Sequence, residues 1–398
     1  MKLYKKHISD LGKVITGKTP RTSILENYGG KIPFLTPSDN LSEKFSPTTS
    51  KTLTKIGLNE VKNCLLPSKS ICVSCIGSDL GKVVLTKKPT VTNQQFNSIV
   101  PNEENDADFI YYLMTVVGKH LNYLSKTSTA VPIINKSTFA NYEIEIPNIK
   151  EQKRIGEILS SLDDKIELNR RINDNLEQQA QALFKSWFVD FEPFKNGQFV
   201  DSELGKIPEG WKVGYLSEIA DIIMGQSPNG STYNENGEGI IFYQGRAEFG
   251  TRFPSIRLFT TNPTRIAPAN SILISVRAPV GDINITHKEC CIGRGLASAV
   301  SRTNKSAFLL YTLFSLKSDL DKFNAEGTVF GSINRKALET LKILIPTNDL
   351  ISKFEAIVAS MDQQILILHI ESENLKILRD TLLPKLMSGE LKINDINN

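Results

Sequence analysis

The chain has 398 residues, of which 40% are hydrophobic and 23% are charged, with 25 Gly and 18 Pro. These fractions exclude disorder, collagen and a small disulfide scaffold, and the length predicts two or three domains. No apolar run is long enough to cross a membrane, and the first residues lack the apolar stretch of a signal peptide. We therefore expect a soluble, cytoplasmic protein. Its net charge of +4 is too small to indicate nucleic-acid binding by itself.

The five cysteines are an odd number in a long chain, which argues against a disulfide framework. Cys72 and Cys75 lie in an apolar run, SICVSCIG, that predicts a strand. Three residues apart on a strand, they point to opposite faces and cannot share a tetrahedral metal ion. We predict buried, apolar thiols and no metal site.

Internal similarity between the two halves is the strongest pattern in the sequence. Residues 8–20 (ISDLGKVITGKTP) align without a gap with residues 216–228 (LSEIADIIMGQSP), and residues 144–147 align with 343–346. A long segment of helical periodicity follows each of the second pair. The order of globular segment, long helix, globular segment, long helix indicates a duplicated domain and not a solenoid.

Two long helices are predicted from apolar residues spaced by three and four. The first runs from about Asn148 to Trp187, and the second covers residues 350–383, with Pro384 marking its end. Each apolar stripe needs a partner. A coiled coil with another chain would supply one, but the duplication favours an intramolecular antiparallel pair. The stripe residues are Ile158, Leu162, Ile166, Leu176 and Leu183 on the first helix and Ile357, Met361, Ile365, Leu375 and Leu382 on the second.

These patterns predict an internal pseudo-twofold repeat. Two globular lobes, residues 1–147 and 189–348, are joined by two long antiparallel helices that form a coiled coil. The helical segments are residues 148–188 and 349–390. Such a helix pair would hold two similar lobes at a fixed separation.

The basic residues of the two predicted lobes differ in kind. Residues 1–147 contain one arginine, Arg21, whereas residues 189–348 contain eight. Arginine can pair bidentately with guanine, while Asn and Gln suit adenine. The aligned polar loops also differ: TPSDN, GSDLGK and TNQQFN face YQGRAEFGTRF, RAPVGD and IGRGLA. Two lobes that recognise different DNA sequences would show this pattern. Ordinary surface divergence between old duplicated domains would also show it.

The sequence lacks the motifs of an enzyme that acts on DNA. Asn262-Pro263-Thr264 lacks the second proline and the aromatic residue of an adenine methyltransferase motif, and no P-loop occurs. Asp190, Glu192 and Lys195 are the nearest approach to a nuclease centre, and we interpret them as part of a solvated linker. We predict no catalytic residue in this chain.

Three segments resemble the specificity subunits of type I restriction–modification systems. Residues 145–194 (EIPNIKEQKRIGEILSSLDDKIELNRRINDNLEQQAQALFKSWFVDFEPF) resemble the central conserved region of that family. Residues 201–228 resemble the entry to its second target-recognition domain, and residues 378–393 (LRDTLLPKLMSGELKI) resemble its C-terminal conserved segment. The resemblance covers essentially the whole chain.

The resemblance implies a mixed α/β fold, in which lobes 1–147 and 189–348 are α/β target-recognition domains. Each would read half of a split site in double-stranded DNA. Segments 148–188 and 349–390 would be the central and distal conserved helices, which set the spacer between the half-sites. Two modification subunits would dock on the helices and, with restriction subunits, form the full restriction enzyme. S-adenosylmethionine, ATP and magnesium would be used by those partners, with none in this chain, and adenine methylation would be the outcome. A coiled-coil scaffold for protein interaction, without DNA specificity, is the main alternative, and a methyltransferase or nuclease is the third.

Candidate DNA-binding residues come from the loops that differ between the halves. We expect phosphate contacts for lysine and base-edge contacts for glutamine and arginine, although each residue could equally be a solvated loop residue. The arginine excess also predicts that residues 189–348 read the half-site richer in guanine. The candidates are Ser38, Asp39, Lys82, Gln94 and Gln95 in the first lobe and Gln244, Arg246, Arg277 and Arg294 in the second.

Overall fold

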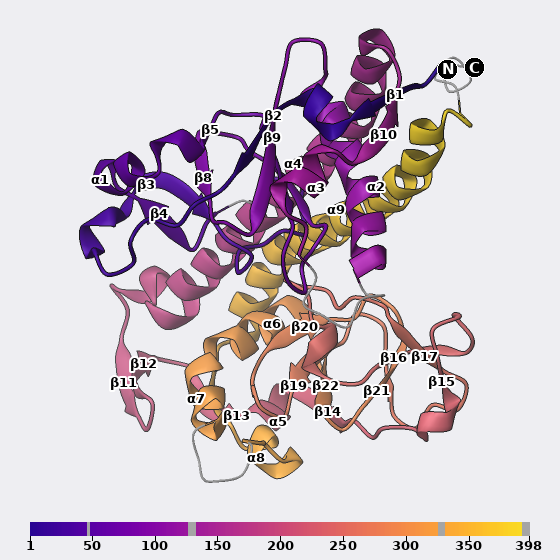
Figure 1. Cartoon of the computed structure of the whole chain (residues 1–398). Coiled ribbons are helices and arrows are strands. Elements are labelled where there is room, and N and C mark those ends of the chain that lie inside the picture. The colour runs from indigo at the N-terminus through magenta and orange to yellow at the C-terminus, as the bar shows by residue number, and fades with distance from the viewer. Residues whose placement is uncertain (46–47, 126–132, 325–330, 392–398) are drawn as a thin grey trace. The chain divides into compact units, whose positions relative to one another are not determined.

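The computed structural model describes residues 1–45, 48–125, 133–324 and 331–391. The chain divides into two compact units: unit 1 comprises Met1–Asn169 and Glu371–Asn398, and unit 2 comprises Arg170–Ile370. Both units combine helices with strands, so the predicted mixed α/β class is confirmed (Figure 1). Within the described ranges, no helix is both long and apolar enough to cross a membrane.

Unit 1 contains two four-stranded sheets and a two-stranded one. The first sheet has the order β2-β9-β6-β7, with antiparallel neighbours: β2 (Gly12–Thr16), β9 (Phe96–Pro101), β6 (Ile71–Ser74) and β7 (Val83–Leu85). The second has the order β4-β3-β8-β5, with only β3 and β8 parallel: β4 (Lys51–Leu53), β3 (Tyr28–Leu35), β8 (Thr90–Thr92) and β5 (Leu65–Leu66). The third pairs β1 (Tyr4–His7) with β10 (Glu143–Ile146).

The helices of the unit 1 lobe are α1 (Lys55–Glu60), α2 (Ala107–Ser125) and α3 (Lys136–Ala140), with short 3-10 turns at Ile8–Leu11, Leu25–Asn27 and Lys62–Cys64. Asp106 begins α2, because its Oδ1 accepts a hydrogen bond from the backbone nitrogen of Phe109 at 2.9 Å. A carboxylate there satisfies a free amide and suits the positive end of the helix dipole. Helix α2 lies against strands β6 and β7 (Figure 1).

Strand β6 is buried along its whole length because both of its faces are covered. Alternate side chains of a strand point to opposite faces. Ile71 and Val73 pack with Tyr112 of α2, whereas Cys72 packs on the other face with Phe96 and the second sheet. This explains why the run that contains Cys72 is continuously apolar.

Unit 2 contains a four-stranded sheet with the order β14-β22-β19-β20, again with antiparallel neighbours: β14 (Ala220–Met224), β22 (Leu296–Ser301), β19 (Ile272–Ser275) and β20 (Ile283–Ile285). A five-stranded sheet has the order β15-β17-β16-β21-β18, with only β16 and β21 parallel: β15 (Tyr233–Asn234), β17 (Leu258–Thr260), β16 (Ile240–Tyr243), β21 (Cys290–Ile292) and β18 (Ile266–Ala267). The described part of the unit also has two strand pairs: β13 (Lys212–Tyr215) with β23 (Lys342–Ile345), and β11 (Phe199–Ser202) with β12 (Gly205–Pro208).

The short helices of unit 2 are α5 (Leu216–Ile219), α6 (Ser306–Ser315), α7 (Lys317–Asp321) and α8 (Arg335–Glu339). Its 3-10 turns are Glu192–Phe194, Gly230–Thr232, Arg246–Glu248 and Lys322–Asn324. Strand β19 is buried on both faces: Ile272 and Ile274 pack in the cluster that contains Tyr311 of α6, and Leu273 packs with Ile292. The central strands of the two units therefore use alternate apolar residues in the same way.

Two long helices, α4 (Ile149–Phe184) and α9 (Asn348–Ser388), contribute residues to both units. Helix α4 continues directly into a π-helical turn at Lys185–Val189. The prediction that the second helix ends at Pro384 is wrong, because Pro384 lies inside α9. A proline there removes one backbone hydrogen bond, but the neighbouring Leu383 and Leu386 are buried in the unit 1 core. Their packing keeps the last turn helical.

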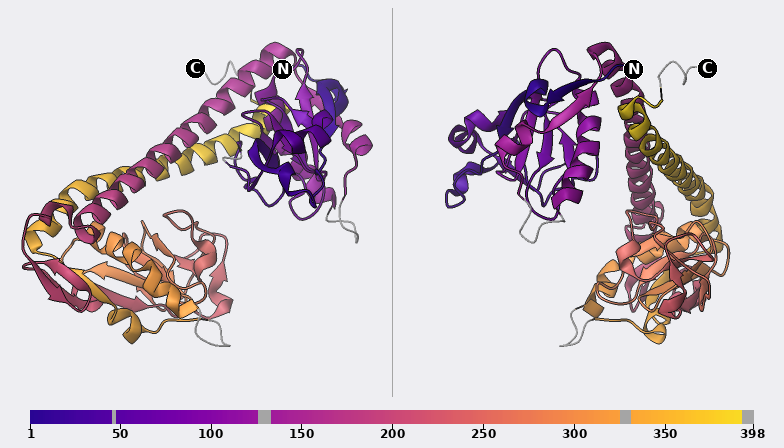
Figure 2. Two further views of the ribbon diagram at one scale, coloured as in Figure 1. Left: turned by 90° about the vertical axis from the view of Figure 1, so that its left-hand side faces the viewer. Right: turned by 45° about the vertical axis from the view of Figure 1, so that its right-hand side comes forward.

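Within unit 1, the first part of α4 runs antiparallel to the last part of α9 (Figure 2). Asp163 Oδ1 accepts a hydrogen bond from Arg379 Nη1 at 2.6 Å, and Asn169 Nδ2 donates to Ser372 Oγ at 3.3 Å. Residue numbers thus rise on one helix as they fall on the other. Asn169 is fully buried, and a buried amide between helices favours the register in which its hydrogen bonds are made.

Asp163 also links the helix pair to the lobe of unit 1, because its Oδ2 accepts from the Tyr112 hydroxyl at 2.5 Å. We expect Asp163→Ala to lower the free energy of unfolding of unit 1 by about 2 kcal/mol, since the buried hydroxyl loses its acceptor. Arg379 limits the loss because it keeps Asp380 as a second partner. Hydrogen exchange of α2 would measure the effect. Asp164→Ala removes the exposed neighbouring carboxylate and should have little effect; equal losses in both variants would contradict this role.

Within unit 2, the other parts of α4 and α9 also lie antiparallel (Figure 2). Phe354 of α9 packs against Phe184, with ring centroids 5.7 Å apart, and against Phe188 of the π-helical turn, at 5.1 Å. Asn173 Nδ2 donates to the carbonyl oxygen of Ile365 at 3.2 Å. Aromatic packing at one end and a polar contact further along fix the register in this unit.

Candidate nucleic-acid interface

In unit 1, loops from three strands meet around the turn at residues 93–95. The backbone nitrogen of Asn93 donates to the carbonyl oxygen of Leu35 at 3.1 Å, and that of Cys75 donates to Gln95 at 2.8 Å. The backbone nitrogen of Lys18 donates to the carbonyl oxygen of Thr92 at 2.9 Å. The segments that follow β2, β3 and β6 therefore form one loop cluster on a rigid framework, a common position for binding residues.

Unit 2 builds the same arrangement around residues 293–295. The backbone nitrogen of Gly293 donates to Tyr243 at 2.8 Å, that of Val276 donates to Gly295 at 2.9 Å, and that of Gln226 donates to Ile292 at 2.9 Å. Loops after β14, β16 and β19 are joined by these bonds.

The loop after β2 in unit 1 and the loop after β14 in unit 2 each need a glycine. A Cβ atom on Gly17 would lie 2.2 Å from the carbonyl oxygen of Asn93, and one on Gly225 would lie 2.1 Å from that of Gly293. No side chain fits at such distances, so both glycines allow the close backbone approach that joins the loop to the central turn. The aligned glycines of the two halves thus have a physical role.

The predicted site residues of unit 1 differ in how exposed their side chains are and in whether they already have hydrogen-bond partners. Lys82 and Ser38 are exposed, and so is Gln94, whose Oε1 accepts from Thr19 Oγ1 at 2.7 Å. Asp39 instead organises its own loop: it accepts hydrogen bonds from the backbone nitrogens of Thr36 at 2.7 Å and Ser50 at 2.6 Å. Gln95 is half-buried and accepts from the Asn93 side chain at 2.8 Å. DNA contact by these residues stays a prediction.

All four predicted residues of unit 2 are exposed and lie in its loop cluster. Gln244 and Arg246 follow β16, Arg277 follows β19, and Arg294 lies in the central turn. Within the described parts of the chain, the guanidinium groups of Arg277 and Arg294 have no hydrogen-bond or ion-pair partner. Arg246 differs, because its Nε donates to Asp282.

Not all eight arginines of residues 189–348 are available for DNA. Arg252 is buried between the carboxylates of Glu177 and Asp362. Arg257 is 57% exposed, and its Nη2 pairs with Glu248, a carboxylate that is only 2% exposed and that also accepts from the backbone nitrogen of Gly245 at 3.0 Å. Arg252 supports the structure of unit 2, so the arginine count overstated the basic groups that are free to bind DNA.

Several loop residues were not among the predicted candidates although they lie in the same clusters. Lys18 and Thr19 follow β2, and Gln226 and Ser227 follow β14. The signal was present in the sequence, since both pairs stand between the aligned glycine and proline of residues 17–20 and 225–228.

Cys72 and Cys75 are buried thiols in the core of unit 1. Burial raises the pKa of Cys72 to about 12 and that of Cys75 to about 11, so both thiols are protonated at neutral pH. They belong to different clusters, on opposite faces of the first sheet. Within the described residues, no group of three or more His, Cys, Asp or Glu side chains could hold a metal ion.

The ten predicted helix-stripe residues are packed to different degrees. Ile365 is buried, and Ile357 is 41% exposed. The remaining eight are half-buried, and the part of each in binding a partner stays a prediction. They are Ile158, Leu162, Ile166, Leu176, Leu183, Met361, Leu375 and Leu382.

Each α/β unit thus presents one cluster of loops with exposed polar or charged side chains, an arrangement typical of recognition proteins. The chain belongs to the type I restriction–modification DNA specificity family, whose model, described as "Type I restriction modification DNA specificity domain", matches residues 2–178 and 208–375. The resemblance predicted from the sequence is confirmed. Membership of this family does not favour the alternative of a scaffold without DNA specificity.

Similar proteins include two specificity subunits from Methanocaldococcus jannaschii. The subunit of the type I restriction enzyme MjaIX is 29% identical over 98% of this chain and 94% of its own length. The putative subunit of MjaX is 33% identical over 79% of this chain and 76% of its own length. The crystal structure of a type I restriction–modification S subunit from M. genitalium shares the fold, with a TM-score of 0.60 and 20% identity over 97% of this chain and 96% of that one.

Proposed function

We propose that this chain binds a bipartite target in double-stranded DNA, with each recognition lobe reading one half-site. The observation that carries the proposal is the double family match, since residues 2–178 and 208–375 each match a DNA specificity domain. The common strand order of the sheets β2-β9-β6-β7 and β14-β22-β19-β20 supports an internal duplication with pseudo-twofold symmetry. The lobes of the proposal are residues 1–147 and 189–348.

We further propose that residues 148–188 and 349–390 form an antiparallel coiled coil that sets the spacer between the half-sites. The antiparallel contacts inside each unit, such as Asp163 with Arg379, support this part. Two modification subunits would dock on the helical segments, joined by restriction subunits in the complete enzyme.

In this proposal the chain selects the sequence and performs no catalysis. The modification subunits would methylate adenine in both half-sites with S-adenosylmethionine, and ATP and magnesium would be used by the partners. Because the ligand is cellular DNA, the proposed location is the cytoplasm.

Sequencing of methylated bases in the host, with and without this gene, tests the proposal. Deletion should abolish one bipartite adenine-methylated motif. Exchanging residues 189–348 for the corresponding segment of another family member should then change only one half-site, and exchanging residues 1–147 should change only the other. A change in both halves after a single exchange would refute the modular assignment, and no lost motif after deletion would refute the function.

A further inference from the structure

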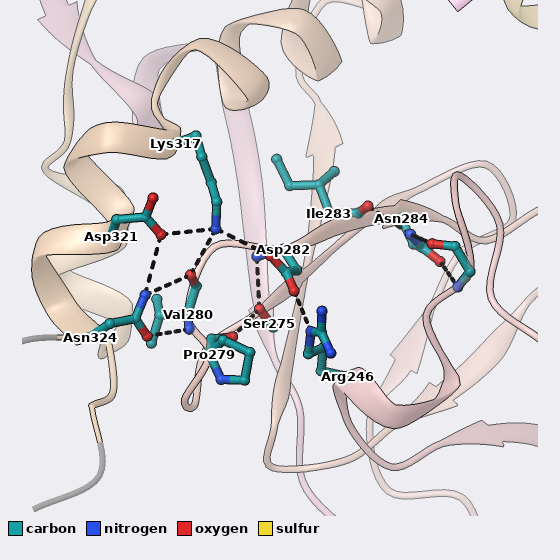
Figure 3. A network of polar contacts seen from close by, with 11 residues as sticks. Arg246, Ser275, Pro279, Val280, Asp282, Ile283, Asn284, Lys317, Asp321 and Asn324 are labelled. Atoms are coloured by element: carbon teal, nitrogen blue, oxygen red, sulfur yellow. Dashed lines mark hydrogen bonds and ion pairs between the residues drawn. The ribbon is translucent and has the colours of Figure 1, made fainter. Parts of the chain in front are cut away.

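Asp282 lies in the unit 2 loop cluster, and its carboxylate forms ion pairs with both Arg246 and Lys317 (Figure 3). Its Oδ2 accepts from Nε of Arg246, which comes from the loop after β16. Its Oδ1 accepts from Nζ of Lys317 on α7 at 3.2 Å. Burial acts to raise the pKa of Asp282, but the hydrogen bonds and charges of the two cations outweigh burial and lower that pKa below its ordinary value. Asp282 is therefore ionised at neutral pH.

The backbone that carries Asp282 is firmly held. Ser275 Oγ accepts from the Asp282 backbone nitrogen at 2.9 Å. The side chain of Asn324 accepts from the backbone nitrogen of Val280 at 2.6 Å and donates to its carbonyl oxygen at 3.2 Å (Figure 3). Lys317 is itself fixed by Asp321 at 2.9 Å. Asp282 is thus a fixed acceptor that can orient the exposed side chain of Arg246.

The corresponding turn of unit 1 has the same glycine and the same closing hydrogen bond, but it is one residue longer and has other side chains. Gly81 and Gly281 have φ values of 87° and 88°. In unit 1 the backbone nitrogen of Ser74 donates to the carbonyl oxygen of Lys82 at 2.9 Å, and in unit 2 that of Ser275 donates to Asp282 at 2.9 Å. Lys82 occupies the place of Asp282. The aligned loops likewise place Ser38 where unit 2 has Arg246. The fold does not need an ion pair here, so the Arg246–Asp282 pair is specific to unit 2.

The hydrogen bond also decides which edge of the Arg246 guanidinium is available. Asp282 takes Nε, whereas Nη1 and Nη2 have no partner among the residues that the structure describes. The Arg246 side chain is 54% exposed. Two parallel N–H donors at the end of an arginine match O6 and N7 of guanine in the major groove. With Lys317 on its other oxygen, Asp282 is neutralised and does not by itself repel a phosphate nearby.

We propose that Asp282 is a positioning residue that orients Arg246 toward one guanine of the half-site read by unit 2. This inference rests on the proposed function. Loss of the Asp282 charge should leave Arg246 in place but free to rotate, so discrimination at one base pair would fall while non-specific attraction to phosphate would remain. The opposite possibility is that Asp282 holds Arg246 away from DNA and competes with it.

The test uses the full chain assembled with its modification subunit. Binding affinity is measured at one salt concentration for three kinds of DNA duplex. The first contains the motif found by sequencing of methylated bases, the second kind has single base-pair changes across the half-site, and the third is an unrelated sequence. For Asp282→Asn we expect about a tenfold loss of discrimination at one base pair, with unchanged affinity for the unrelated duplex and an unchanged melting temperature. Arg246→Ala should lose discrimination at the same base pair, and the double variant should be no worse than Arg246→Ala, because the two residues act as one unit.

A matched control is Asp221→Asn, which removes another carboxylate that is paired with an arginine in unit 2. Asp221 bonds to Arg302 Nε at 2.8 Å at the start of β14, outside the loop cluster, and its replacement should change nothing. Tighter binding of Asp282→Asn with discrimination intact, or additive losses in the double variant, would overturn the inference. A wild-type complex without any sequence preference would instead overturn the proposed function, and the inference with it.

Discussion

Replacing Arg252 by alanine is expected to lower the free energy of unfolding of unit 2 by about 3–5 kcal/mol. The Arg252 side chain is only 9% exposed and forms ion pairs with Glu177 of α4 and, at 2.5 Å, with Asp362 of α9. Its Nη1 also donates to the Tyr311 hydroxyl at 3.2 Å. Truncation leaves two carboxylates with little access to water and no cation between them. Both tryptophans, Trp187 and Trp211, lie in unit 2, so urea unfolding followed by tryptophan fluorescence reports on this unit.

The defect should depend on pH, in a direction set by Asp362. Burial raises the pKa of Asp362 above its ordinary value, while the Arg252 charge opposes that rise. A carboxyl whose pKa is higher in the folded chain adds stability below the unfolded pKa of about 4 and loses it as pH rises through the folded pKa. Without Arg252 the folded pKa of Asp362 should rise further. The variant should therefore be weakest near neutral pH and approach the wild type as the pH is lowered toward about 5.

Arg302→Ala provides the control for charge removal. Arg302 and its partner Asp221 are 49% and 63% exposed, and such surface pairs contribute at most about 1 kcal/mol. A loss in Arg252→Ala no larger than that in Arg302→Ala, or a defect that grows on acidification, would contradict the role assigned to Arg252.

The two long helices and the strand around Cys72 follow local patterns, which explains why the sequence predicts them. The segment around Ile8 and the one around Leu216 each give one helical turn followed by a strand, β2 or β14. The long helices follow from apolar spacing, although Ile357 of the predicted stripes is exposed. Spacing shows that a residue is on a helix face. It does not show how much of that face a neighbour covers, and a proline near a helix end yields to packing, as at Pro384.

Side-chain contacts between residues far apart in the chain could not be predicted, because no sequence periodicity relates the two partners. Asp163 and Asp362 stand at aligned helix positions and contact aligned tyrosines, Tyr112 and Tyr311. Asp163 accepts a hydrogen bond from Arg379 of α9, 216 residues away in the chain. Asp362 instead accepts one from Arg252, which lies in a loop 110 residues away. The count of arginines therefore included Arg252 among the potential DNA contacts, whereas in the structure Arg252 is buried and forms ion pairs with Glu177 and Asp362.

The double substitution of Arg277 and Arg294 by alanine is expected to abolish most of the discrimination at the half-site read by unit 2. Both backbones are fixed in the loop cluster: Arg277 forms a β-bridge with Ser332, and the backbone nitrogen of Arg294 donates to Ser227 Oγ at 3.2 Å. Their side chains are exposed and pair with no other described residue, so the fold should be unaffected. If each guanidinium reads one guanine, the two losses together amount to about 2–6 kcal/mol, or roughly 30-fold to 10⁴-fold.

Base contact and phosphate contact predict different results for this variant, measured with the full complex. Loss of base contacts relaxes the target at defined positions, and those positions should be guanines, in line with a guanine-richer half-site for residues 189–348. Loss of phosphate contacts weakens all duplexes alike and lowers the salt dependence by about one unit per arginine. The control Arg302→Ala with Arg335→Ala removes the same charge from unit 2, at exposed arginines that pair with Asp221 and Glu339. Equal effects of the two double variants would show that net charge, and not base recognition, is what the arginines of this unit supply.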